Sequence, residues 1–192
     1  MTTWVAFLRG VNVGGHRVVK MERLRALFGE LGFENVRTYI QSGNVLFDSK
    51  KTSRAALEKA IDGHLEAALG FDVRSFVRKS TDLHALIARD PFSEVEVDED
   101  TRLMVMFLSR PLRSVELPLS SPKGDIELID VTADEALLVL RQRPGRPVDP
   151  TPFLQTLSPP SGGSPMTGRF FPTLVKFVDS WTTAKDVAPR KR

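Results

Sequence analysis

The sequence predicts an α+β protein made of two ferredoxin-like (βαββαβ) subdomains with antiparallel sheets, the second of them degenerate. Three observations predict this class. Apolar runs of strand length alternate with stretches of helical periodicity in the first 80 residues, and polar turn residues separate them. An acidic connector then divides the chain near residues 90–100. We expect subdomains over residues 1–92 and 101–183, followed by a basic disordered tail over residues 184–192.

The first subdomain opens with an apolar run over residues 4–8, which is typical of a buried strand, and a loop begins at Arg9. Apolar side chains then recur at three- and four-residue spacing over residues 21–31, which predicts a helix. Gly32 stands where a C-cap glycine is expected.

Two strand-like runs, residues 36–40 and 45–47, flank a polar turn and predict a hairpin. A second helix is expected between Ser53, a capping residue, and Gly70, and a fourth strand over residues 73–78. Because the crossover from the first to the second strand is right-handed, the end of the first strand and the hairpin turn should lie at the same edge of the sheet.

The second half is less regular. A strand is expected over residues 103–108, a hairpin from residues 126–131 and 136–140, and a helix over residues 174–181. The proline-rich segment 158–165 indicates a flexible loop. No sequence repeat is apparent between the halves.

Composition excludes several classes of function. There is no cysteine, which excludes disulfides, thiolate catalysis and cysteine-based metal sites, and the three histidines offer little for a metal. We expect no cofactor. The N-terminal apolar run is interrupted at Arg9, and no apolar segment approaches membrane-spanning length. We therefore expect a cytoplasmic protein with no membrane association.

The positive charge of the chain is unevenly distributed. Residues 1–80 carry thirteen basic and eight acidic side chains, a net charge of +5, whereas residues 81–150 have a net charge of −6. The tail over residues 185–192 contributes +3. If the protein has a basic surface that binds an anionic partner, this surface belongs to the first half of the chain.

Two polar motifs indicate a ligand site at the shared sheet edge. The first runs from Arg9 to Gly15 between a strand and a helix, where backbone N–H groups and a helix dipole hold anions. Arg9 can clamp a phosphate or carboxylate, and Asn12, Gly14 and Gly15 are further candidates. The alternatives are glycines that only permit tight turns, and an Arg9 that forms a salt bridge to Glu22 or Asp48.

Lys20 lies at the start of the predicted helix, where a cation is unfavourable unless an anion offsets it; an ordinary exposed lysine is the other interpretation. The second motif, Gln41-Ser42-Gly43-Asn44, is good turn chemistry by itself. Gln41 is not needed by the turn, so we assign its amide, with Ser42 and Asn44, to ligand contact.

The stretches LRGVNVGG (residues 8–15) and TYIQSGNVLF (residues 38–47), with Lys20-Met21 between them, resemble domain of unknown function 1697, a bacterial family. The resemblance implies two ferredoxin-like subdomains and no established activity. Family members close with a Thr-Thr-Arg-Asn-Trp-Asn-Thr stretch before a helix containing Lys. Residues 167–173 correspond to it, and the matching residues are Thr167, Arg169, Thr173 and Lys176. Arg169 therefore joins the ligand-binding candidates.

We expect a phosphate-bearing ligand, a nucleotide or single-stranded nucleic acid, at the edge formed by residues 9–20 and 41–44. Nucleic acid would require exposed aromatic side chains on the sheet. The alternatives are an enzyme acting on a small anionic metabolite, with Arg9 as the clamp and His16 or a carboxylate as the base, and a structural or partner-binding module. No catalytic residue is assigned, and the sequence does not define an oligomeric state.

Overall fold

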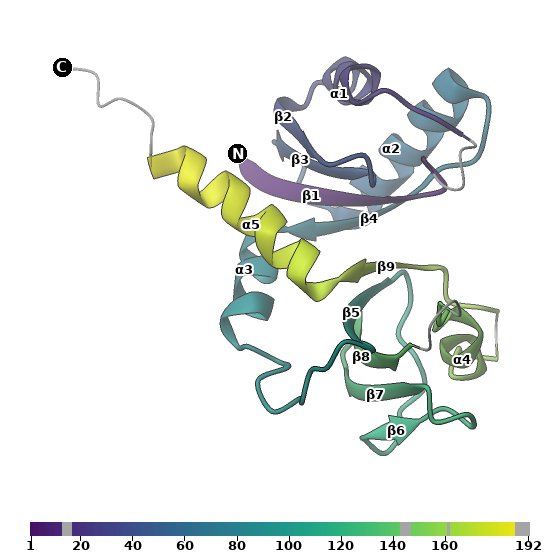
Figure 1. Ribbon diagram of the computed structural model, residues 1–192. Coiled ribbons are helices and arrows are strands. Elements are labelled where there is room, and N and C mark those ends of the chain that lie inside the picture. The colour runs from purple at the N-terminus through teal and green to yellow at the C-terminus, as the bar shows by residue number, and fades with distance from the viewer. Residues whose placement is uncertain (13–16, 143–146, 161, 187–192) are drawn as a thin grey trace. The chain divides into compact units, whose positions relative to one another are not determined.

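The computed structural model describes residues 1–12, 17–142, 147–160 and 162–186, with the backbone alone for residues 182–186. The chain forms two compact units, Met1–Ala85 (unit 1) and Leu86–Arg192 (unit 2). The described residues form two antiparallel sheets, of four and five strands, together with helices (Figure 1), which confirms the α+β class. The division between the units falls within the helix α3 (Ser80–Ala88), ahead of the acidic connector.

Unit 1 follows the predicted order βαββαβ. Its elements are β1 (Thr2–Arg9), α1 (Met21–Glu30), β2 (Glu34–Tyr39), β3 (Asn44–Ser49), α2 (Arg54–Leu69) and β4 (Arg74–Lys79), followed by the start of α3. The strands are antiparallel in the order β2-β3-β1-β4. The end of β1 therefore lies between the turn of the β2–β3 hairpin and the start of β4.

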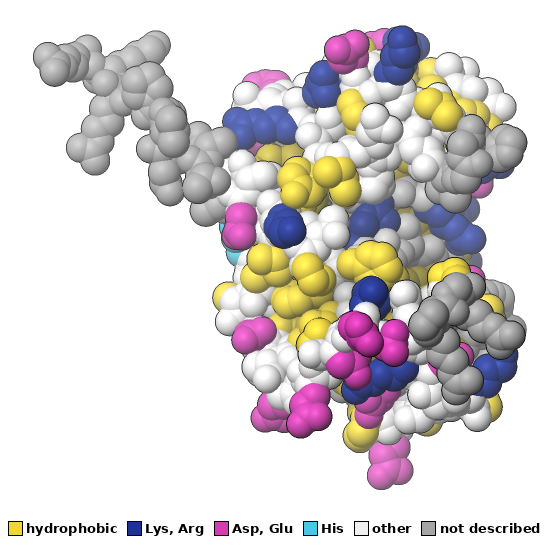
Figure 2. Space-filling view, viewed as in Figure 1, with side chains coloured by type: hydrophobic (Ala, Val, Ile, Leu, Met, Phe, Trp, Pro, Cys, Tyr) yellow, Lys and Arg dark blue, Asp and Glu magenta, His cyan; other side chains and the backbone are white. Residues whose placement is uncertain are grey.

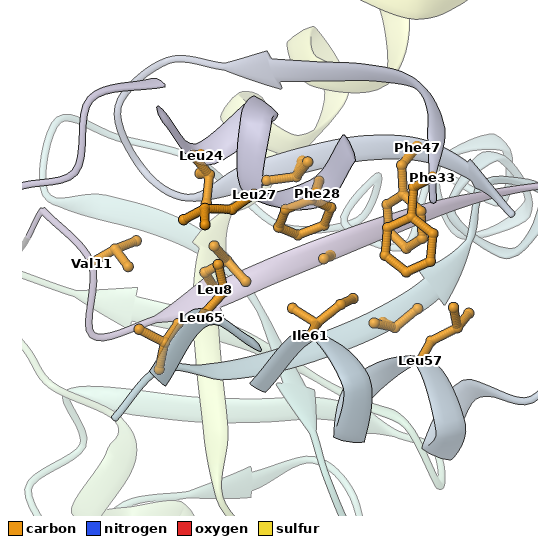
Figure 3. Close-up of a cluster of buried hydrophobic side chains, with 14 of the residues drawn as sticks. Leu8, Val11, Leu24, Leu27, Phe28, Phe33, Phe47, Leu57, Ile61 and Leu65 are labelled. Carbon is orange, nitrogen blue, oxygen red and sulfur yellow. The ribbon is translucent and has the colours of Figure 1, made fainter. Parts of the chain in front are cut away.

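The core of unit 1 lies between the sheet and its two helices. Side chains alternate along β1, so Trp4, Ala6 and Leu8 join this core, whereas Val5 and Phe7 lie on the other sheet face. Figure 3 shows apolar side chains from α1 and α2 pointing into one cluster: Leu24, Leu27 and Phe28 from α1, and Leu57, Ile61 and Leu65 from α2. Val5 and Phe7 are fully buried as well.

Helix α2 also satisfies the backbone of the edge strand β4. The Glu58 carboxylate accepts the backbone N–H of Val77 at 2.9 Å, and Asp62 accepts the N–H of Ser75 at 2.7 Å. An unpaired edge strand is a template for pairing with other chains. The two carboxylates accept two of the backbone N–H groups that such a chain would bind. Burial raises the pKa of both carboxyl groups, against the opposing effect of these hydrogen bonds.

Unit 2 repeats this strand order, with one described helix between its strands where unit 1 has two. After the end of α3, its elements are β5 (Thr101–Leu108), β6 (Leu119–Ser120), β7 (Ile126–Val131), β8 (Glu135–Arg141), α4 (Thr151–Thr156), β9 (Met166–Phe170) and α5 (Phe171–Asp186). The sheet order is β6-β7-β8-β5-β9, so β7-β8-β5-β9 corresponds to β2-β3-β1-β4. Only the short strand β6 stands where unit 1 has α1, and the six-residue α4 replaces the sixteen-residue α2.

The equivalent central strands share a short sequence repeat that inspection of the sequence alone missed. Val5-Ala6-Phe7-Leu8 in β1 matches Val105-Met106-Phe107-Leu108 in β5. The backbone N–H of Leu8 donates to the carbonyl of Gly43 at 2.8 Å, and that of Leu108 donates to the carbonyl of Asp134, also at 2.8 Å. In each unit the hairpin turn is thus fastened to the end of the central strand by the same bond.

The sequence predictions for unit 2 were partly right. The predicted strand 103–108 and the hairpin are present as β5, β7 and β8, and α5 begins three residues before the predicted position 174. Because α5 runs to Asp186, residues 184–186 of the predicted disordered tail are helical, and residues 187–192 lie outside the described residues. The short strand β6, the strand β9 and the helix α4 were missed. Glycine and proline in and around these elements weakened the periodic signal.

Candidate functional site

The structure brings the two polar motifs together at the end of β1. Asn12 makes the connection: its side-chain Nδ2 donates to the carbonyl oxygens of Gln41 at 3.0 Å and Val19 at 3.2 Å. Its Oδ1 accepts the backbone N–H of Val19 at 2.7 Å. These bonds join the loop after β1 to the hairpin turn and to the residue before Lys20. The side chain of Asn12 is thus engaged in holding the loop, not presented to a ligand.

Gly43 explains why the turn can lie so close to β1. It has a φ of +69°, and a Cβ atom at this position would lie 2.7 Å from Val11 Cγ2 and 3.0 Å from Leu8 Cβ. Real Cβ atoms do not approach other atoms so closely, so a larger residue would push the turn away. A glycine at this position is required for packing as well as for the turn.

The other hairpin residues divide into two groups. Asn44 is almost fully buried, and its Nδ2 donates to Ser42 Oγ at 2.7 Å, as the turn interpretation expects. The side chain of Gln41 is exposed, and among the described residues it has no hydrogen-bond partner. Of the hairpin candidates, Gln41 is therefore the one presented to solvent.

Arg9 is the last residue of β1 and is exposed. Its side chain makes no hydrogen bond or ion pair with any residue that the structure describes. The alternative of a salt bridge from Arg9 to Glu22 or Asp48 is therefore wrong. The carboxylate of Asp48 instead accepts hydrogen bonds from Thr3 at 2.7 Å and Asn35 at 2.8 Å.

The cross-strand partner of Arg9 is another arginine, which sequence reasoning did not select. Arg9 pairs in register with Arg74, the first residue of β4, and both are exposed. Directly opposed like charges destabilise a sheet. Arg74 interacts electrostatically with the Asp62 carboxylate, which offsets part of its charge. Its sequence position alone offered no signal, because only the β1–β4 register places it beside Arg9.

A third arginine lies beside the same strand ends. Arg17 Nη1 donates to the carbonyl oxygen of Asp72 at 3.4 Å, and its guanidinium carbon lies 5.3 Å from the centre of the Phe71 ring. A Cβ atom on Gly10, which has a φ of +89°, would lie 3.2 Å from Arg17 Nη1. Arg17 thus crosses from the loop after β1 to the residues that lead into β4.

Lys20 is the N-cap residue of α1. It has an extended backbone, provides no capping hydrogen bond and is exposed. The first turn of α1 therefore has no side-chain cap from the residue that normally supplies one. Gly14 and Gly15, and the proposed base His16, lie outside the described residues.

Arg169 lies in β9 of unit 2. Its Nη1 donates to Thr167 Oγ1 at 3.1 Å and to the carbonyl of Gly168 at 2.7 Å. Burial lowers its pKa to about 10, which leaves the guanidinium charged at neutral pH. The equivalent residue in β4 is Arg78, which donates in the same way to the carbonyl of the preceding Val77 at 2.9 Å. An arginine at this position, opposite Val5 or Val105 of the central strand, is thus shared by the two sheets.

The residues that depart from the family pattern around Arg169 have structural partners of their own. Phe171, which replaces the tryptophan, is buried, and its ring centre lies 4.9 Å from that of Phe92. Pro172 lies in the first turn of α5, where its missing N–H costs nothing. Lys176 is exposed on α5.

Unit 2 offers an internal comparison for the site. The positions equivalent to Arg9 and Arg74 are Ser109 and Pro165, which are adjacent because the N–H of Ser109 donates to the carbonyl of Pro165 at 3.0 Å. Asn44 is replaced by Glu135, which is opposite Phe107 as Asn44 is opposite Phe7. On the face shown in Figure 2, acidic side chains gather on unit 2. The basic edge is therefore specific to unit 1.

The sheet aromatics are not available for stacking. Phe7, Phe47 and Phe76 are fully buried, and Tyr39 is half-buried. The exposed aromatic platform that nucleic acid would require is absent from the described strands of unit 1.

Two further observations concern other kinds of site. Among the described residues, no group of three or more histidine, aspartate or glutamate side chains is placed to hold a metal ion, and no helix is long and apolar enough to span a membrane. Unit 2 contains a pocket of about 1010 Å³ between the β6–β7 turn and α4. None of the predicted site residues lines it.

The fold and the edge site define an α+β protein with two antiparallel sheets and a cationic strand end in the first. The chain belongs to the family described as protein of unknown function (DUF1697), whose model matches residues 1–135. The fold is similar to that of a conserved bacterial protein from Streptococcus pneumoniae, with a TM-score of 0.65 and 22% identity over 93% of this chain and 97% of that one. No curated protein matches the sequence significantly.

Proposed function

We propose that unit 1 binds a phosphate-bearing ligand at the edge formed by residues 9–20 and 41–44, extended to Arg74. The observation that carries this proposal is the opposed, exposed pair Arg9 and Arg74. An anion between two guanidinium groups removes their repulsion and gains charge-assisted, bidentate hydrogen bonds. Arg17 and Lys20 add positive charge beside the same strand ends.

The comparison between the units supports this proposal. We infer that both units are ferredoxin-like copies, because they share a strand order and the bond from the central strand to the hairpin turn. Features that both copies keep, such as Arg78 and Arg169, are explained by the fold. The arginine pair occurs in unit 1 and is Ser109 and Pro165 in unit 2, so the fold does not require it. We place the function in the bacterial cytoplasm, since a chain without cysteine needs no oxidising compartment to fold.

The structural-module alternative also has an observation in its favour, because Asn12, Gly43 and Asn44 are engaged within the fold. It does not account for Arg9, which has no partner among the described residues. If Arg9 braced the fold, Arg9→Ala would cost several kcal/mol, as truncation of a buried charge pair does. An exposed arginine opposite a like charge should instead make no favourable contribution to the stability of unit 1.

Thermal unfolding tests the proposal. The ligands are inorganic tripolyphosphate, the four ribonucleoside triphosphates, and short oligouridylate and oligothymidylate. At about 100 times its dissociation constant, a ligand adds roughly 2.7 kcal/mol, which raises the midpoint by roughly 5–10 °C. Arg9→Ala should abolish the shift, and Arg110→Ala, at the exposed arginine after the equivalent strand, should retain it. No shift with any phosphate compound would reject the function.

A further inference from the structure

The edge of unit 1 has two different sides, and this difference restricts the ligand further than its negative charge does. The strands run in the order β3-β1-β4, so the hairpin turn lies on one side of the end of β1 and Arg74 lies on the other. Adjacent strands are about 4.8 Å apart, so the distance from β3 to β4 is on the order of 10 Å. This distance is comparable to the length of an extended nucleoside diphosphate.

The hairpin side of this edge is apolar and amide-bearing, unlike the cationic side. Ile40 is 52% exposed and Val18 is 71% exposed, two of the few large apolar side chains on the described surface. The bonds of Asn12 to Gln41 and Val19, which neighbour these two residues, hold them at the same junction. The exposed amide of Gln41 carries both donors and an acceptor, as needed to bind the edge of a base.

Ile40 also has an unusual backbone. Its φ is +49°, a left-handed conformation that is strained for a β-branched residue. A glycine or asparagine would adopt it at a smaller cost. The chain keeps an exposed apolar side chain at this position in spite of that cost, and a contact with a ligand would account for it.

We propose that the ligand is a free nucleoside polyphosphate, with its phosphates on Arg9 and Arg74 and its base against Ile40 and Gln41. This inference rests on the proposed function and narrows it. Cross-strand neighbours have Cβ atoms about 4.5–5.5 Å apart, so one arginine fork can hold each of two successive phosphates. Single-stranded nucleic acid fits less well, because Phe7 and Phe76 are buried and offer no stacking surface along the sheet.

The experiment is isothermal titration of the full chain, its Arg74→Ala, Arg74→Lys and Gln41→Ala variants, and the Arg110→Ala control. The titrants are inorganic tripolyphosphate, each ribonucleoside triphosphate, the corresponding nucleosides, and oligouridylates of increasing length. We expect a nucleoside triphosphate to bind more tightly than tripolyphosphate. Arg74→Ala should weaken both about tenfold or more, and Arg74→Lys, which keeps the charge but not the fork, should weaken both to a smaller extent.

Gln41→Ala separates this inference from the function on which it rests. It should weaken the nucleoside triphosphate about fivefold and leave tripolyphosphate unchanged. Equal affinity for tripolyphosphate and every nucleoside triphosphate would overturn the inference while the phosphate site stands. Affinity that rises with oligouridylate length beyond that of any mononucleotide would also overturn it, in favour of nucleic acid. If no phosphate compound binds, the proposed function and this inference fail together.

Discussion

The side-chain amide of Asn12 donates to the main-chain carbonyl of Gln41 at 3.0 Å, and this bond connects motifs that are 29 residues apart in the sequence. The same amide group also binds Val19, the residue before Lys20. Asn12 thus positions the start of α1 and the hairpin turn relative to the end of β1. The residues that we propose to touch the ligand depend on this one side chain for their placement.

Replacing Asn12 by alanine should destabilise unit 1 and loosen the loop. Asn35 is a matched control, because it also has a positive φ, 51° against 53°, and its side chain makes a hydrogen bond to Asp48. Both alanine variants lose the tolerance of asparagine for this backbone. We expect Asn12→Ala to cost about 1–3 kcal/mol more than Asn35→Ala, because it leaves several backbone groups unsatisfied.

The measurement for this pair is urea unfolding followed by tryptophan fluorescence. The chain has two tryptophans, Trp4 and Trp181, so a Trp181→Phe background reports on unit 1 through Trp4. Equal losses in Asn12→Ala and Asn35→Ala would show that the bonds of Asn12 contribute little.

Gly43→Ala should be more costly than alanine at other glycines with a positive φ. Gly32 and Gly70 have φ values of +77° and +75°, and nothing lies within 4 Å of a Cβ atom at either position. Alanine there costs about 1 kcal/mol from the backbone alone. At Gly43 the close contacts with Val11 and Leu8 should add about 1–3 kcal/mol. The same fluorescence assay compares the three variants, and equal costs would contradict the tight approach of the turn to β1.

Removing one member of the Arg9–Arg74 pair should stabilise the free protein slightly at low salt. Relief of the like-charge repulsion should contribute roughly 0.2–1 kcal/mol, and the gain should disappear at about 1 M salt, where the Debye length falls to about 3 Å. Urea unfolding of Arg9→Ala at 10 mM and 1 M sodium chloride measures both effects. A loss of stability at low salt would show that Arg9 has a favourable partner.

Glu58 and Asp62, whose carboxylates accept backbone N–H groups of β4, predict how the stability of the protein changes with pH. Burial raises the pKa of Glu58 and Asp62 in the folded state. Their contribution to stability is therefore greatest below the unfolded-state pKa and is lost as the pH rises through the folded-state pKa. Compared with the Glu58→Gln, Asp62→Asn double variant, the wild-type protein should lose stability as the pH rises above about 4, the ordinary carboxyl pKa.

Asp98 provides a control, because its pKa is shifted in the opposite direction and its effect on stability should have the opposite pH dependence. Hydrogen bonds from Thr101 and nearby backbone groups lower the pKa of this carboxyl. The stability that it contributes is present above its unfolded-state pKa and is lost as the pH falls. Asp98→Asn should therefore reduce the difference in stability between neutral and acid pH. Between pH 3 and pH 7, the stability difference between the wild-type protein and each variant should change with opposite slopes for the two sets of variants. Slopes of the same sign would contradict one of the two assignments.

Much of unit 1 could be predicted because its local signals agree with its packing. Leu24, Leu27 and Phe28 recur at helical spacing and are the buried residues of α1, while Gly70 ends α2 in the expected left-handed conformation. In unit 2 the signals were weaker. The strand β9 contains Gly168, and α4 is only six residues long, too short for a periodic pattern to emerge.

The candidate site could be located from the sequence, but the roles of its residues could not. Topology and turn chemistry were sufficient to bring the motifs to one edge. Asn12 looked like a ligand contact, and only the structure shows that its amide is engaged by the backbone. Arg74 was missed because cross-strand register depends on the whole sheet and leaves no trace in a short motif.

The central claim is that Arg9 and Arg74 together bind phosphate. The most direct test is NMR observation of the arginine side-chain Nε–Hε resonances while the protein is titrated with inorganic tripolyphosphate. The account predicts large, saturable shifts for Arg9 and Arg74, and small ones for Arg102 and Arg113, whose guanidinium groups donate to backbone carbonyls in unit 2. Equal, non-saturating shifts of all four, or shifts that leave Arg9 and Arg74 unaffected, would contradict it.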